Sequence, residues 1–251
     1  MRNTWRIAAL ALVMGTFLMA YAKTPAAPAK ASAAQAGGAA NLETVLNLMD
    51  ETAAKFKTVE TDFYWDQYSM VVDDHDTQSG TMYFRRQGKD VEMAADIQKH
   101  NGQADLKYVL FAGGKVQVYQ PRIAQVTVYS AGKNKAEFES FLVLGFGGSG
   151  HELEKSFDLK YGGRETVDGV NAYKLELTPK SQKMRGMFQR ITLWIDPQRG
   201  VSVQQRFDEK VNGSGDYRLA KYTNIKLNQK IPDSTFKLKT SGKVTYITPQ
   251  G

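Results

Sequence analysis

Apolar residues recur along the chain with two different spacings, and each spacing predicts a different element. After Asn41 they fall at every third or fourth position, which places them on one stripe of a helix. Asn41 suits the N-cap, and Lys55 and Lys57 suit the negative end of the helix dipole. We therefore expect an amphipathic helix that begins after Asn41 and ends near Phe56.

Beyond this helix the apolar spacing changes to two, which is typical of β-strands. Phe63 and Trp65 alternate with polar neighbours, and Met82 and Phe84 begin a second run of this kind. Further strand-like runs cover 107–111, 116–119, 126–129, 157–161, 170–178, 188–195, 201–207 and 217–227. Asn-Gly, Asp-Gly and Gly-Gly pairs punctuate them, as in hairpin turns. About eleven short strands predict one continuous antiparallel sheet that curls towards a barrel, in a mainly β protein with some helix.

One helical segment interrupts the strands. The stretch 134–142 has the spacing of a capping box followed by an apolar stripe that includes Phe138 and Phe141, and Ser149 with Glu152 predicts another short helix. The glycine-rich residues between them lack the lysine of a phosphate-binding loop, so we interpret them as a hinge or loop. The insertion is either a lid on the barrel or an ordinary helix on the back of the sheet, and the pattern favours neither.

The N-terminus has the pattern of a secretory signal. Two arginines precede an apolar run of about 13 residues, whereas a membrane-spanning helix needs about 20. Ala20 and Ala22 provide the small residues of an A-x-A cleavage site. We expect 1–22 to be a signal peptide, 23–40, which is half alanine, to be a flexible linker, and 41–251 to be the folded domain.

Composition narrows the possible chemistry. The 251 residues include no cysteine, which excludes disulfides, thiolate metal sites and a nucleophilic thiol. The three histidines, His75, His100 and His151, are far apart in the sequence and have no histidine partner at helical spacing. The sequence also lacks the common motifs of serine hydrolases and zinc proteases. We therefore expect no enzymatic activity, no cofactor and no bound metal.

The net charge of +7 falls to +5 once residues 1–22 are removed, because 31 basic and 26 acidic residues remain. These charges are interleaved along the chain, without the basic block that nucleic-acid binding favours. A charged surface with some attraction to anionic lipid headgroups is the simpler interpretation. Together with the signal peptide, this predicts a protein released into a bacterial periplasm.

A succession of segments resembles one known family. The segments are AKFK at 54–57, SGTMYFRR at 79–86, GGKVQVYQP at 113–121, QVT at 125–127, LELTPK at 175–180, LWID at 193–196 and NIKLNQKIPDSTF at 224–236. Their order over about 42–248 is similar to that of the LolA-type periplasmic lipoprotein carriers. The resemblance implies an incomplete β-barrel whose concave face holds acyl chains, with an N-terminal helix and short lid helices. We expect such a chain to act as a monomer.

The resemblance also implies a function and a site. Carriers of this type take lipoproteins from an ATP-driven transporter of the inner membrane and pass them to an acceptor at the outer membrane. Arg86 matches the family's functional arginine, so we expect it to act as a lid latch through backbone carbonyls. Our candidates for lining the lipid-binding cavity are Phe63, Trp65, Met82, Phe84, Val118, Phe138 and Phe141.

Two departures from the family leave alternatives open. Gln87 follows Arg86 where the family has proline, and Gln117 or Val118 stands where the family often has tryptophan. A carrier of another amphiphile, such as a glycolipid or an isoprenoid, therefore remains an alternative to a lipoprotein carrier. A periplasmic regulator that senses lipoproteins is a further alternative, because related sensors use the same fold.

Overall fold

The predicted helix is the first element of the described chain. The computed structural model describes residues 42–88, 90–130, 144–209 and 215–249, all within one compact unit, Ala40–Gln250. Helix α1 (Leu42–Lys55) buries Val45, Leu46 and Met49, which belong to the stripe predicted from the sequence. The expected signal peptide and linker lie outside the described residues.

Strands make up most of the described chain, and the helices after α1 are short. The strands are β1 (Thr58–Ser69), β2 (Asp74–Gln87), β3 (Asp90–His100), β4 (Gln103–Ala112), β5 (Lys115–Gln120), β6 (Gln125–Ser130), β7 (Phe157–Val167), β8 (Val170–Pro179), β9 (Phe188–Ile195), β10 (Ser202–Glu209), β11 (Tyr217–Leu227) and β12 (Thr245–Ile247). The short helices are η1 (Pro121–Ile123), α3 (Gly150–Leu153), α4 (Gln182–Arg185) and η4 (Asp233–Phe236). The pairs at 101–102, 113–114 and 168–169 form hairpin turns, as predicted.

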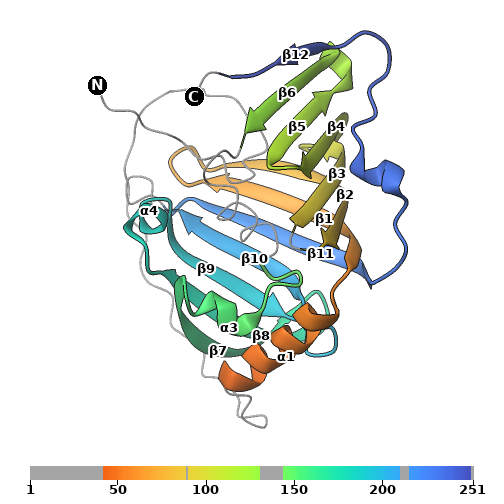
Figure 1. Cartoon of the computed structure of the whole chain (residues 1–251). Coiled ribbons are helices and arrows are strands. Elements are labelled where there is room, and N and C mark those ends of the chain that lie inside the picture. The colour runs from red at the N-terminus through yellow and green to blue at the C-terminus, as the bar shows by residue number, and fades with distance from the viewer. Residues whose placement is uncertain (1–41, 89, 131–143, 210–214, 250–251) are drawn as a thin grey trace. The chain divides into compact units, whose positions relative to one another are not determined.

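All these strands belong to a single sheet in the order β12-β6-β5-β4-β3-β2-β1-β11-β10-β9-β8-β7 (Figure 1). The end strands β12 and β7 do not pair, so the sheet stays open and the predicted incomplete barrel is confirmed. The expectation of a wholly antiparallel sheet is wrong at one edge, where β12 runs parallel to β6. A parallel pair needs a long connection, and here residues 131–244 lie between the two strands.

One face of the sheet, which we call the inner face, carries α1. Val45, Leu46 and Met49 of α1 share a buried cluster with Leu175 of β8 and Leu193 of β9. Figure 1 shows α1 and α3 in front of β7–β10. The inner face is thus the one that the predicted helices approach, and it contains a large apolar cluster.

The opposite, outer face is covered in part by the C-terminal segment. Ile231 and Phe236 pack there on Ala94 and Leu110 of β3 and β4, before the chain returns to pair with β6. No helix among the described residues is long and apolar enough to cross a membrane.

Candidate functional site

Five of the seven predicted lipid-binding residues share the inner face. Directly opposite residues of antiparallel strands point to the same side of a sheet, so the register fixes this placement. The register pairs Thr61 with Met82 and Trp65 with Gln78 between β1 and β2, and it continues from Met82 across β3 and β4 to Val118. Phe63, Met82, Phe84 and Val118 are buried, and Trp65 is partly buried. Phe138 and Phe141 lie outside the described residues.

Strand β3 contributes to this surface, although it was not among the strands predicted from the sequence. Met93, Ala95 and Ile97 are buried and point to the inner face, because their partners on β2 are Phe84, Met82 and Gly80. Their alternation with polar or small neighbours is the period-two signal of a strand. The β1–β6 part of the inner face is therefore a more continuous apolar surface than the predicted residues alone describe.

The glycine-rich segment 144–150 lies on the inner face, where it contacts β2, β10 and β11. Phe146 is 1% exposed and stacks on Phe84 with ring centroids 5.5 Å apart. It also makes an edge-to-face contact with Tyr222, with ring centroids 4.5 Å apart. The Leu144 carbonyl accepts a hydrogen bond from Gln205 Nε2 at 2.5 Å, and the Gly145 carbonyl accepts one from Ser202 N at 2.7 Å. The described part of the insertion thus lies on the inner face and not on the back of the sheet.

Two glycines in this segment are required by close packing. A Cβ atom at Gly147, whose φ is +74°, would lie 2.4 Å from Phe56 Cγ. A Cβ atom at Gly150 would lie 2.6 Å from the Leu46 Cα atom of α1. The two glycines therefore have a packing role: without a Cβ atom, they let the segment lie directly against α1 and against Phe56, which follows α1.

Arg86 joins three parts of the site. Its guanidinium donates from Nη1 to the Ala53 carbonyl of α1 at 3.1 Å and from Nη2 to the Gly147 carbonyl at 2.6 Å. Its Cζ atom lies 5.5 Å from the centroid of the Phe56 ring. A guanidinium is well suited to this bridge because its donors are fixed in one plane. Both acceptors are backbone carbonyls, the kind of partner that the resemblance implied; the role of Arg86 as a latch stays a prediction.

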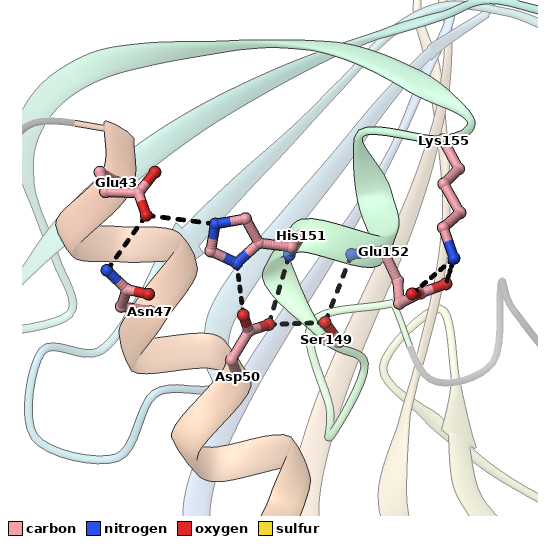
Figure 2. A network of polar contacts seen from close by, with 7 residues as sticks. All are labelled: Glu43, Asn47, Asp50, Ser149, His151, Glu152 and Lys155. Carbon is pink, nitrogen blue, oxygen red and sulfur yellow. Dashed lines mark hydrogen bonds and ion pairs between the residues drawn. The ribbon is translucent and has the colours of Figure 1, made fainter.

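A second set of contacts ties α3 to α1 (Figure 2). Asp50 of α1 accepts a hydrogen bond from Ser149 Oγ at 2.5 Å and also contacts His151 Nδ1, while His151 Nε2 lies 3.3 Å from Glu43 Oε1. Ser149 Oγ in turn accepts a hydrogen bond from Glu152 N, which is the capping contact predicted from the sequence. Because Ser149 donates to the carboxylate and not to the histidine, the arrangement is not that of an activated serine.

The histidine and the aspartate of this network stabilise each other's charged forms. Its hydrogen bond to Asp50 raises the pKa of His151, burial partly opposes this, and the charges of Asp50 and Glu43 raise it further. Burial would raise the pKa of Asp50, but hydrogen bonds from Ser149 and His151 and the charge of His151 outweigh burial and lower it. Both ring nitrogens face carboxylates, so the contacts favour a doubly protonated imidazolium.

A hollow of about 560 Å³ lies beside β1, β11 and the β7–β8 turn. Charged side chains at its rim are paired: Lys226 Nζ lies 2.7 Å from Glu60 Oε1, and Asn224 Nδ2 donates to Asp62 at 2.7 Å. We assign no ligand to this hollow. Within the described ranges, no group of three or more His, Cys, Asp or Glu residues is placed to hold a metal ion.

Comparison with known proteins identifies relatives of the whole domain. Residues 54–239 match the family model of the outer membrane lipoprotein carrier protein LolA. A crystal structure of MucB has a TM-score of 0.51 at 14% identity, covering 83% of this chain and 66% of that chain. An uncharacterized conserved protein from Thermus thermophilus has a TM-score of 0.52 at 11% identity, covering 82% and 98%. These two likenesses show the fold alone. No curated protein matches the sequence.

Proposed function

Because the chain belongs to the LolA family of outer membrane lipoprotein carrier proteins, we propose that it is a periplasmic carrier that shields the acyl chains of lipoproteins. The observation that supports this proposal is the apolar β1–β6 part of the inner face, which the segment 144–150 contacts at Phe84. Loading from an inner-membrane lipoprotein-releasing transporter and delivery to an outer-membrane acceptor complete the proposal, with the chain acting as a monomer.

The energetic need for such a carrier follows from the cargo. Burying one methylene group contributes about 0.8 kcal/mol, so an acyl chain exposed to water is unfavourable by on the order of 10 kcal/mol. Apolar side chains such as Phe63, Met82 and Val118 offer this burial without covalent chemistry. Hydrophobic binding of this kind is non-directional, so it suits acyl chains that are attached to lipoproteins of different sequence.

A carrier must also release its cargo, and the segment 144–150 is suited to this task. Phe146 covers Phe84 on the surface that we assign to the acyl chain. An acyl chain and Phe146 therefore compete for the same area, and the contacts of Arg86 strengthen the closed state. Cargo affinity is then set by the difference between the two states.

Two tryptophans on opposite faces of the sheet provide a direct test. Trp65 lies on the inner face, whereas Trp194 is buried with Val167 and Val203 in a separate cluster. Bromine atoms quench tryptophan fluorescence only at short range. In a chain that starts at residue 23, a lipopeptide with a dibrominated acyl chain should quench the Trp194→Phe variant, which reports Trp65. The same ligand should leave the Trp65→Phe variant, which reports Trp194, nearly unchanged.

Absence of quenching in both variants, or equal quenching of both, would contradict an acyl site on the inner face. The non-brominated lipopeptide is the matched control for changes in fluorescence that do not come from bromine.

A further inference from the structure

The inner face becomes polar towards the β1–β2 and β3–β4 turns. Gln78 lies two residues before Gly80 on β2 and is paired with Trp65. On the far side of β3, Lys107 of β4 is paired with Ile97, which is itself paired with Gly80. Gln78 and Lys107 thus point to the same face as the apolar residues, at the end of the same surface.

Both side chains are buried, and both keep hydrogen-bonding capacity that the described residues leave unused. Gln78 and Lys107 are each 3% exposed. In the part of the chain that the structure describes, Gln78 Oε1 has no hydrogen-bond partner, and Lys107 Nζ has no partner besides the carboxylate of Asp105. Lys107 Nζ lies 2.9 Å from Asp105 Oδ2, and this ion pair balances its charge. An ammonium has three N–H groups, however, so at least two of them have no acceptor.

Such groups need a structural reason, because an unsatisfied buried donor or acceptor costs about 1–3 kcal/mol. Here the unused capacities are complementary: Gln78 Oε1 can only accept a hydrogen bond, and the remaining N–H groups of Lys107 can only donate. Their strands are separated by β3 alone and so lie about 10 Å apart, and the register places Lys107 level with Gly80, two residues along β2 from Gln78. A trans amide group presents its N–H and its carbonyl on opposite sides. It could therefore contact Gln78 with its N–H and Lys107 with its carbonyl when it lies between these two side chains.

We propose that Gln78 and Lys107 form a polar subsite for the amide group of an N-acylated ligand whose chain lies on the apolar inner face. Lys107 Nζ donates to the amide oxygen, and Gln78 Oε1 accepts from the amide N–H. This inference rests on the proposed function and specifies its substrate class as N-acyl amides. A carboxylate or an ester satisfies Lys107 but has no donor for Gln78.

The test compares two brominated ligands of equal chain length, an N-methyl amide and a methyl ester, in the Trp194→Phe background. Gln78→Met should weaken binding of the amide about tenfold and leave binding of the ester unchanged, because only the amide has an N–H group. Lys107→Met should weaken both ligands, since both have a carbonyl. The matched control Lys99→Met, which changes an exposed lysine of β3, should weaken neither.

A second measurement separates a binding role from a structural one. Gln78→Met replaces an unpaired buried group by an apolar one of similar length, so the variant without ligand should melt at the same or a higher temperature than the parent. The proposal is wrong if Gln78→Met binds the amide as tightly as the parent, or loses amide and ester equally. If the parent protein binds neither ligand, the acyl site itself is wrong, and the proposed function fails with it. Should Gln78→Met not fold, the premise that this group is unpaired is wrong.

Discussion

Removal of Arg86 tests how the closed state is held. In Arg86→Leu, the hydrogen bonds to the Ala53 and Gly147 carbonyls are lost, together with the contact to the Phe56 ring. A hydrogen bond that involves a charged group contributes about 1.5–3 kcal/mol, and a cation–π contact at this distance about 0.5–1 kcal/mol. Because these contributions are not additive and Arg86 is partly exposed to water, we expect a net loss of about 2–3 kcal/mol in the closed state.

This loss should appear as tighter cargo binding. If cargo displaces the segment 144–150, weakening the closed state by about 2–3 kcal/mol raises the affinity for an acylated peptide by about 30- to 150-fold. Transfer to an acceptor should slow by a similar factor, while loading stays intact. Titration of a fluorescent lipopeptide and stopped-flow transfer to acceptor vesicles measure the two effects.

The neighbouring arginine is the matched control. Arg85 points to the other face, where it donates to Glu92 and lies 4.2 Å from the centroid of the Phe236 ring. Arg85→Leu therefore removes an equal charge and similar contacts without touching the segment 144–150. A folded Arg86→Leu variant with the affinity and transfer rate of the parent would refute the latch, as would an equal gain of affinity in Arg85→Leu.

Two further predictions concern the packing of the segment 144–153. Gly147→Ala should lower the free energy of unfolding by about 2–4 kcal/mol, since it adds a steric overlap with Phe56 to the strain of a positive φ. The control Gly163→Ala, at φ +87° with open space around it, should lower it by only about 1 kcal/mol. Equal losses in urea unfolding would refute the close packing of Gly147 against Phe56. The raised pKa of His151 predicts that its contribution to stability is complete below pH 6.5 and is lost as pH rises through the raised value. Thermal melting from pH 5.5 to 8.5 should show this loss in the parent and not in His151→Gln, and parallel curves would contradict it.

The period of apolar residues was sufficient to predict the main elements. The stripe of α1 and the alternation in β1 and β2 follow from local spacing, which depends only on the geometry of each element. Strand β3 carries the same alternation through Val91, Met93, Ala95 and Ile97, so the same criterion identifies it, although it is not among the predicted strands. Strand β12 was not predictable in this way, because it has three residues and its parallel pairing depends on where the chain returns.

The side-chain contacts within the candidate site are harder to predict from the sequence than the helices and strands. The resemblance drew attention to Arg86, but the carbonyls that it binds carry no residue-type signal and are chosen by the fold. The glycines around Phe146 predict a hinge or loop and give no sign that this side chain packs on Phe84. His151 has no sequence signal for its role, because its carboxylate partner Asp50 comes from a helix about a hundred residues earlier in the chain.

The most direct test of the carrier proposal is native mass spectrometry of the protein purified from its own periplasm without detergent. The account predicts a fraction of molecules that carry the added mass of an acylated lipoprotein or its acylated peptide. A bound glycolipid or isoprenoid, or an empty protein that also fails to take up an acylated probe, would contradict it.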